Sequence, residues 1–395
     1  MSKVTLAISI GLLCLMLTYI QRLPYLPIPA DYSKALGELS NSEPLELIDP
    51  TTGHLRYQGW GKYPNKWLYN PSMSKACGRF KKFWNYFYII SENYLVTMAH
   101  TDIGTLRAAY VNIRNIKNMS EPTIEVKVED FFRQYVTIET EKNGAGVYST
   151  VANPDLNMTF FQRPESTSAK IDISGITGQN EIEAAFIADS KGYEGISSVS
   201  ETYHDKSRHV YSHKIQKKFV GDLKINGKSI VTCTIQQPCL GIFDNGRGHF
   251  PYVSRWIWPS TTFKVGNHEV LINLGYSQDN PHASFDAVFV DGKLYKLDPL
   301  ILVKETEDHW KWVKAEQSNT HSNSLKLEFN RTHHHSVGVE YPLDFLKYVI
   351  PFKVNLDANY GFYSGEIKIN EGRTTKLSIK FDEVFGFIED FHALW

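Results

Sequence analysis

The sequence lacks an excess of charge of either sign. Its 395 residues contain 42 Lys and Arg against 43 Asp and Glu, which gives a formal net charge of -1. It also lacks the basic clusters that neutralise phosphates, so nucleic acid is not an expected partner. A G-x-S-x-G elbow, a Walker loop, a G-x-G-x-x-G after a strand, H-E-x-x-H and an EF-hand loop are missing too. The common nucleotide and hydrolase chemistries have no support, and we expect no cofactor.

Cysteine is scarce, with Cys14 in an N-terminal apolar segment and Cys77, Cys233 and Cys239 in the body. Cys233 and Cys239 enclose five residues and could close a short disulfide loop in an oxidising compartment. Two reduced, buried thiols are an equally open alternative. No C-x-x-C pattern is present, so the cysteines do not indicate a zinc site.

Three consecutive histidines, His333, His334 and His335, are the other candidates for metal binding. Neighbouring residues of a strand point to opposite faces, so only the first and third could share one ion. Arg331 and the glycosylation sequon at Asn330 lie beside them and favour a solvated loop. We therefore expect no metal site.

Long segments with a helical period are missing, and the best helical candidate, residues 343–349, is followed at once by Pro351. The dominant period is two, as in the alternating stretches 124–129, 325–329 and 377–381. The dipeptides Asn226-Gly227 and Asp291-Gly292 each separate two such stretches, which is typical of type I′ hairpins. The pattern predicts an all-β fold with antiparallel neighbours and little helix.

The N-terminus carries a hydrophobic leader, because residues 4–20 contain no charge and follow Lys3. No small-x-small cleavage pattern follows, which favours an uncleaved signal anchor over a signal peptide for residues 1–22. Lys3 and the amino terminus, set against Arg22, favour a cytosolic N-terminus. We expect attachment to a membrane through this segment and a lumenal or extracellular body, with a secreted protein as the alternative. Prolines in residues 23–49 predict a stalk or linker.

Aromatic residues make up 13% of the chain and meet polar residues in the block from Phe243 to Trp258. Strand alternation places Trp256 and Trp258 on one side, and Asp244 lies in a glycine-rich turn sequence. One interpretation is that a partly desolvated Asp244 donates a proton and the tryptophans stabilise the resulting cation. The alternative is a structural strut between Asp244 and Arg247, with the tryptophans in the core.

Two further clusters contain candidate site residues. The chain ends in an aromatic segment that holds Glu389, Asp390 and His392, which could form an acid/base group or be solvated edge charges. Nearer the N-terminus, Trp84 begins the aromatic run WNYFY. Taken alone, that run indicates an aromatic strand.

The clusters resemble, in order, one family. The blocks are GWGKYP (59–64), RFKKFWNYFYII (79–90), YSHK (211–214), FDNGRGHFPYVSRWIW (243–258), INLG (272–275), FDAVFVDGKLYKLD (285–298) and GFIEDFHALW (386–395). They are similar to the uncharacterised family known as domain of unknown function 2804, over about residues 50–395. The resemblance implies a fold like that of the double lipocalin-like proteins that include carotenoid 1,2-hydratase and tocopherol cyclase. Those relatives protonate isoprenoids without redox cofactors.

The sequence departs from the family's usual pattern in its leader, in His249, and in Asp286, where the family often has Glu or Asn. Together, pattern and resemblance predict two consecutive lipocalin-like antiparallel β-barrel halves, residues 50–205 and 206–395, packed together with a cavity near their junction. The predicted function is to bind an apolar small molecule, a lipid or isoprenoid. The alternative is a cofactor-independent isomerase, cyclase or hydratase of an isoprenoid. The predicted residues are Asp244 and Glu389 for catalysis and, for ligand binding, Arg247, Tyr252, Trp256, Trp258 and Trp84.

Overall fold

The all-β fold is confirmed. The computed structural model describes residues 36–39, 44–62, 67–74, 81–104, 106–140, 147–163, 166–202, 205–277, 285–314, 323–340, 353–372 and 374–394. Across these ranges the elements are strands, apart from the 3-10 helix η3 (Pro71–Met73). No helix in this part of the chain is long and apolar enough to span a bilayer. The leader, Cys77 and the candidate helix at 343–349 lie outside the described residues.

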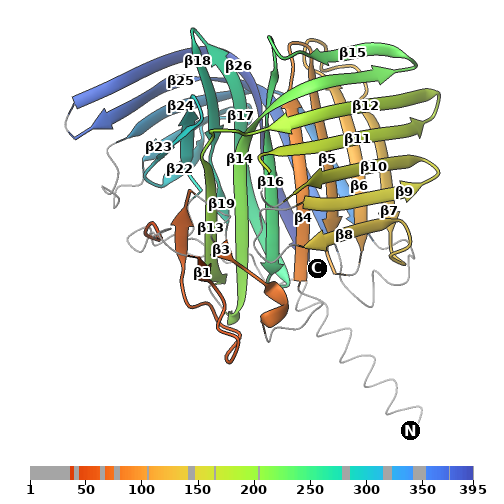
Figure 1. Ribbon diagram of the computed structural model, residues 1–395. Helices are drawn as coiled ribbons and strands as arrows, with labels where there is room; N and C mark the ends of the chain where they lie inside the picture. Colours follow the sequence, from red (N-terminus) through yellow and green to blue (C-terminus); the bar gives the residue numbers. More distant parts are fainter. Residues whose placement is uncertain are drawn as a thin grey trace, which may run out of the picture.

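The first sheet bends round into a nearly closed barrel. Its main path runs in the order β7-β6-β5-β4-β16-β14-β12-β11-β10-β9-β8, and β7 contacts β10 and β11 across the remaining gap. Figure 1 shows these strands in orange to green. The strands are β2 (Gly59–Gly61), β4 (Lys81–Ile90), β5 (Tyr94–Asp102), β6 (Arg107–Asn115), β7 (Ile124–Asp130), β8 (Val136–Thr140), β9 (Val147–Asn153), β10 (Leu156–Gln162), β11 (Ser168–Thr177), β12 (Asn180–Asp189), β13 (Gly195–Thr202), β14 (Asp205–Ile225), β15 (Lys228–Cys233) and β16 (Cys239–His249).

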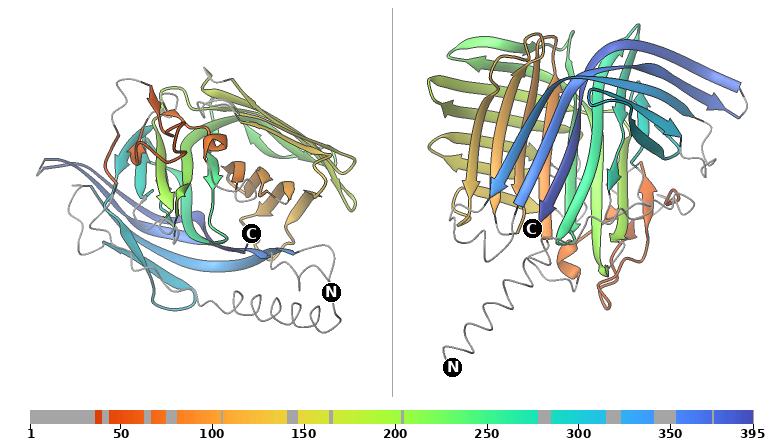
Figure 2. Two further views of the ribbon diagram at one scale, coloured as in Figure 1. Left: turned by 90° about the horizontal axis from the view of Figure 1, so that it is seen from below. Right: turned by 180° about the vertical axis from the view of Figure 1, so that it is seen from behind.

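The second sheet follows in the chain and has the order β21-β20-β18-β17-β26-β25-β24-β23-β22, with β19 beside β17. Seen from behind, its long blue strands cross in front of the orange strands of the first sheet (Figure 2). The strands are β17 (Val253–Val265), β18 (His268–Asn273), β19 (Tyr276–Ser277), β20 (Ala287–Val290), β21 (Lys293–Lys296), β22 (Leu300–Lys304), β23 (His309–Lys314), β24 (Ser324–Glu340), β25 (Lys353–Glu371) and β26 (Thr374–Leu394). A separate pair is formed by β1 (Leu45–Glu46) and β3 (Trp67–Leu68).

The change from one sheet to the other occurs in residues 250–252, between β16 and β17. The sequence had predicted a boundary between the halves at residues 205/206, the start of β14, which pairs with β12, β13, β15 and β16 of the first sheet. The folded body also includes part of the predicted stalk, because Leu47 and Ile48 are buried. Leu47 packs in a cluster with Trp67, Tyr69 and Tyr211.

Both predicted hairpin turns are confirmed. Asn226 and Gly227 have φ of 51° and 74° between β14 and β15, and Asp291 and Gly292 have φ of 51° and 77° between β20 and β21. A type I′ turn requires positive φ at both central residues, which Asn-Gly and Asp-Gly tolerate. The three predicted alternating stretches lie in β7, β24 and β26.

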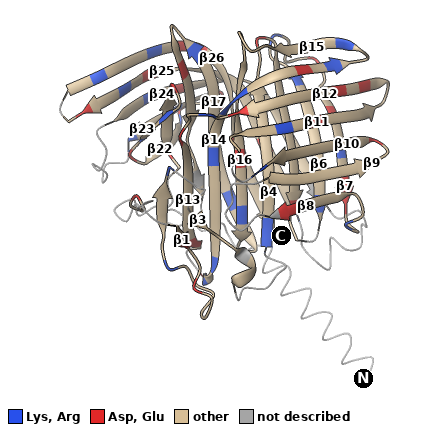
Figure 3. Ribbon diagram, viewed as in Figure 1, with Lys and Arg blue, Asp and Glu red and all other residues tan. Residues whose placement is uncertain are grey.

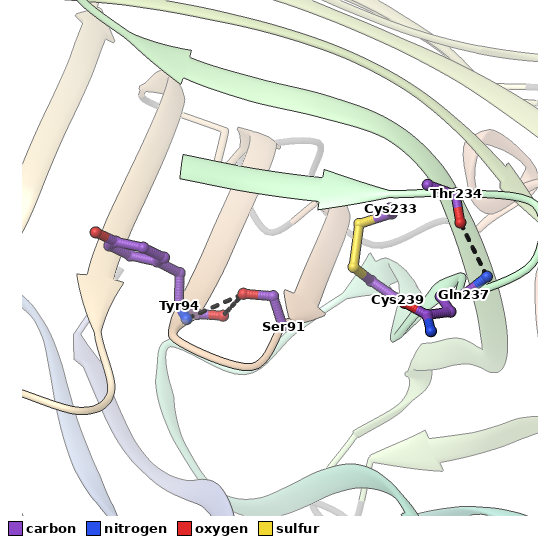
Figure 4. Close-up of a disulfide and its surroundings, with 6 residues drawn as sticks. All are labelled: Ser91, Tyr94, Cys233, Thr234, Gln237 and Cys239. Carbon is purple, nitrogen blue, oxygen red and sulfur yellow. Dashed lines mark hydrogen bonds between the residues drawn. A yellow bond between two sulfur atoms is a disulfide. The ribbon is translucent and has the colours of Figure 1, made fainter. Parts of the chain in front are cut away.

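Cys233 and Cys239 form a disulfide that closes the loop between β15 and β16 (Figure 4). Gln237 N donates to Thr234 Oγ1 within the same loop. The sequence had left the choice between bonded and reduced cysteines open, and the structure resolves it in favour of the bond. A disulfide of this kind persists in an oxidising compartment.

Three hydrophobic clusters account for most of the core. One fills the barrel of the first sheet and includes Phe87, Phe160 and Phe219. A second lies on the second sheet around Trp310 and Phe329. A third joins residues of both sheets, among them Tyr86 and Tyr88 of β4 with Trp258 of β17 and Phe387 of β26. This third cluster borders the cavity described next.

Candidate functional site

A cavity of about 270 Å³ lies between the two sheets. Strands β4, β5, β6, β7, β14 and β16 supply one wall, and β17, β24, β25 and β26 supply the other. The sequence predicted a cavity near the junction of halves 50–205 and 206–395; the observed cavity lies between the two sheets. The lining is mostly apolar and aromatic, with few charged groups. Such a surface suits an apolar small molecule with few polar groups.

Strand register explains how the sequence builds the first wall. Lys214, Asp244, Tyr86, Ala99 and Tyr110 are direct neighbours across β14, β16, β4, β5 and β6. All five line the cavity. Because side chains alternate between the faces of a strand, one row of paired residues points to one side. Their neighbours along each strand, such as Phe87 and Phe243, point into the barrel instead.

A buried ion pair occupies this wall. Lys214 Nζ lies 2.7 Å from Asp244 Oδ2, and the two side chains are only 9% and 6% exposed. Trp84 Nε1 donates to the same oxygen at 3.2 Å, whereas Asp244 Oδ1 is buried without a hydrogen-bond partner in the described part of the chain. Lys214 Nζ also sits 3.8 Å from the ring centre of Trp258, a cation–π contact with the opposite wall. Figure 3 shows the basic segments of β14 and β16 in the middle of the molecule.

Glu389 of β26 faces the cavity from the second wall, directly paired in register with Trp258. Burial raises its pKa from the usual 4.5 to about 8; the Lys214 ammonium opposes this shift, and the Asp244 charge adds to it. The carboxyl group therefore carries a proton at neutral pH. Burial also raises the pKa of Tyr110 well above 10, with Glu389 adding to the shift, so that phenol is neutral as well.

An aromatic stack forms the part of the cavity lining next to Asp244. The rings of Trp256 and Phe391 are 3.7 Å apart and nearly parallel, and Trp84 stacks on Trp256 at 5.8 Å. The register of β17 against β26 brings the two rings together, because Trp256 and Phe391 are directly paired. Aromatic π electrons attract positive charge, so this part of the cavity lining can stabilise a cation in the ligand.

Gly246 allows Trp84 to lie flat against β16. A Cβ at this position would be 1.9 Å from Cζ2 of the Trp84 ring. Gly246→Ala should displace the indole, break its hydrogen bond to Asp244 and cost about 1–3 kcal/mol in the free energy of unfolding. Urea denaturation and near-UV circular dichroism measure both effects. Gly338→Ala, where the nearest atom would be 3.5 Å away, is the matched control, and equal effects of the two substitutions would contradict the prediction.

Comparison with known proteins identifies the family of this chain. The family described as "Domain of unknown function (DUF2804)" matches residues 39–395. The protein belongs to this family. No curated protein matches the chain.

Two solved structures resemble this DUF2804 protein. CghA has a TM-score of 0.53 at 10% identity, covering 89% of this chain and 96% of its own. Kievitone hydratase from Nectria haematococca has a TM-score of 0.47 at 10% identity, covering 88% and 98%. The likeness to CghA shows a shared fold over nearly the whole length of both chains.

Five of the seven site residues predicted for the DUF2804 chain line the cavity: Asp244, Glu389, Trp84, Trp256 and Trp258. Arg247 and Tyr252 do not. Arg247 is three positions from Asp244 on β16 and so points to the opposite face, where its guanidinium lies 4.7 Å from the Tyr211 ring centre. The proposed strut between Asp244 and Arg247 is wrong, because Asp244 pairs with Lys214.

Three lining residues were not predicted from the sequence: Lys214, Tyr86 and Tyr110. Lys214 closes the YSHK block, and Tyr86 lies in the aromatic run of β4, but neither pattern indicates which partner the side chain meets. Lys214 and Asp244 are separated by 30 positions, and a turn with a disulfide lies between them. Only the register of β14 against β16 makes them neighbours.

Proposed function

We propose that the cavity is the active site of a cofactor-independent isomerase, cyclase or hydratase that protonates an apolar, unsaturated substrate of isoprenoid type. One observation carries the proposal: Glu389, a carboxyl group with a pKa of about 8, faces an apolar cavity walled by aromatic rings. A general acid needs a pKa near the working pH, and burial gives this carboxyl that value. The family resemblance to carotenoid 1,2-hydratase and tocopherol cyclase, which is a likeness of fold, supports the same chemistry.

The first step uses Glu389 as the proton donor. Its O–H bond breaks, the π electrons of a substrate double bond form a new C–H bond, and the neighbouring carbon becomes a cation. Trp84, Trp256 and Phe391 line the cavity as an aromatic stack, and their π electrons would stabilise this cation. Exclusion of water by the apolar lining protects the cation from unwanted capture.

The second step uses Asp244 as the base. Its Oδ1 atom, which makes no hydrogen bond in the described residues, can accept the proton that leaves a carbon next to the cation. The pair of electrons from that C–H bond then forms the new double bond, which completes an isomerisation or a cyclisation. In a hydration, water attacks the cation and Asp244 takes the proton that water loses. Two carboxyl groups in different environments suit these opposite roles.

Binding without reaction is the other candidate function. The mostly apolar lining and the aromatic stack support a carrier of a lipid or isoprenoid as well as an enzyme. In a carrier, the polar cluster of Lys214, Asp244 and Glu389 would orient the single polar end of the ligand. Arg247, the residue first expected to do so, lies on the other face of β16.

Mass spectrometry of protein purified from its own source would separate the two functions. We expect the full chain to retain an apolar molecule and, in D₂O, to give a product with one deuterium in a new C–H bond. Glu389→Gln and Asp244→Asn should retain the molecule but form no product. A ligand recovered unchanged from the wild-type protein would contradict catalysis and support a carrier. Absence of any retained apolar molecule would contradict both.

A further inference from the structure

A buried arginine lies beside the cavity without a carboxylate partner among the described residues. Arg114 is in β6, on the same face as Tyr110 and Asn112, and both of these residues line the cavity. Arg114 is only 3% exposed. The alternation of β6 therefore places a guanidinium beside the cavity, in the space between β6 and Tyr360 of β25.

The contacts of Arg114 do not neutralise its charge. Its guanidinium carbon lies 4.5 Å from the ring centre of Tyr360 on β25, and its Nε atom is buried without a hydrogen-bond partner in the described part of the chain. Within the described ranges no carboxylate comes within 4 Å of it. Burying an unpaired charge costs several kcal/mol. A fold that holds such a charge in place is ready to receive an anion there.

Glu125 is one of two acidic groups in this neighbourhood; the other is Glu389, which also raises the pKa of Tyr360. Glu125 lines the cavity and acts on the pKa values of His335 and Tyr360. It makes no ion pair with Arg114 among the described contacts. The negative charge of Glu125 disfavours an anion on the β7 side of Arg114. The space left for an anion is therefore on the side where Arg114 faces β24 and β25.

Two histidines of β24 supply hydrogen-bond donors on that side. His333 and His335 alternate in step with Val337, which lines the cavity, and His333 pairs in register with Tyr360. The His333 ring centre is 6.4 Å from that of Tyr360. Burial, and next the charge of Arg114, lower the pKa of both histidines, so both are neutral at pH 7. A neutral imidazole can donate one N–H to an anion.

We infer that Arg114 anchors the anionic head group of an amphipathic ligand, a carboxylate or a phosphate, whose apolar body extends along the cavity. His333 and His335 would donate to the same head group. A guanidinium offers paired N–H donors that match both kinds of oxyanion. The inference rests on the proposed function for the place of the apolar body. It adds the substrate class: an acidic isoprenoid or lipid rather than a neutral hydrocarbon.

The test compares dodecanoate, dodecyl phosphate and 1-dodecanol, which share one alkyl chain and differ in head group. Binding to the full chain at pH 7 is followed by the fluorescence of the tryptophans that line the cavity. We expect the better anion to bind at least about tenfold more tightly than dodecanol, as one charge-assisted contact would provide. The tighter of the two anions identifies the head group.

Arg114→Met should remove the preference for the anion and leave the dissociation constant of dodecanol unchanged. Lys127→Met is the matched control, because Lys127 is a cation that lines the cavity but is paired with Glu129. This control should keep the preference. Without ligand, Arg114→Met should unfold at the wild-type temperature or above, since it removes an uncompensated buried charge.

Three binding results would overturn the inference. They are equal affinity of the wild-type protein for all three compounds, a preference for the anion that survives in Arg114→Met, and a preference that disappears in Lys127→Met. A large drop in the unfolding temperature of Arg114→Met would also overturn it, because Arg114 would then be a strut between the sheets. The deuterium experiment is independent of these outcomes. A protein that forms product but shows no anion preference refutes the head-group site alone.

Discussion

Glu389→Gln is expected to make the protein more stable at neutral and alkaline pH while it abolishes proton transfer to the substrate. The carboxyl has a pKa of about 8 in the folded chain and near 4.5 in an unfolded one. Between these values the folded state holds a proton that the unfolded state releases, so the wild-type protein loses stability as pH rises from about 4.5 to about 8. Below pH 4.5 both states are protonated, and the penalty disappears.

The glutamine variant removes this pH dependence because its amide stays neutral. At pH 8 to 9 we expect its free energy of unfolding to exceed that of the wild type by on the order of 3 kcal/mol. This figure is below the full shift, because part of the Glu389 residue remains accessible rather than fully buried. Urea denaturation at pH 4, 6 and 8.5 provides the measurement. Glu181→Gln, on the exposed face of β12, should show no such difference.

The same substitution should lower the rate of product formation by about 10²–10⁴, the usual contribution of a positioned acid. The wild-type rate should fall as pH rises through 8, because the proton that Glu389 donates is then lost. A wild-type rate that increases steadily from pH 6 to 9 would contradict the assignment of Glu389 as the acid. A glutamine variant less stable than the wild type at pH 8.5 would contradict its raised pKa.

Lys214→Met is expected to destabilise the protein by about 3–5 kcal/mol, because it leaves the Asp244 carboxylate buried with Trp84 as its remaining hydrogen-bond donor. Methionine keeps the length of the lysine stem, so packing against Trp258 is largely retained. Thermal and urea unfolding at pH 7 give the magnitude.

The double variant Lys214→Met with Asp244→Asn tests whether the loss of stability comes from the unpaired carboxylate or from lost packing of the lysine stem. Neutralising both members removes the unpaired charge, so most of the lost stability should return. If the double variant is as unstable as Lys214→Met alone, the loss comes from packing and not from the isolated carboxylate. Lys224→Met, at an exposed position of β14 close to Asp222, is the control and should change stability by less than about 1 kcal/mol.

The sequence was most informative where the physics is local. Alternation in residues 124–129 and 377–381 identified strands because a pleated strand turns successive side chains to opposite faces. Asn226-Gly227 identified a hairpin because few other residues tolerate two positive φ angles in succession. The pairing of Trp256 and Trp258 on one side followed from the same alternation, and both line the cavity.

The sequence was least informative about partners across strands. Asp244 was grouped with Arg247, three residues away, on proximity in sequence alone. An odd separation on one strand puts two side chains on opposite faces, so this pair could not form once the segment proved to be strand throughout. The true partner, Lys214, is on another strand and is selected by register, which single-strand patterns do not fix.

By itself, then, the sequence determined an all-β chain, its hairpin turns, its family and five of the side chains that line the cavity. The strands and turns could be predicted because they depend on short-range periodicity and turn chemistry. The tertiary structure alone decided that the sheets divide at residues 250–252, that Lys214 rather than Arg247 meets Asp244, and that Glu389 holds a proton at neutral pH. Each of these depends on which strands lie side by side and on how far water is excluded. Both are properties of the packed sheets and not of any local segment.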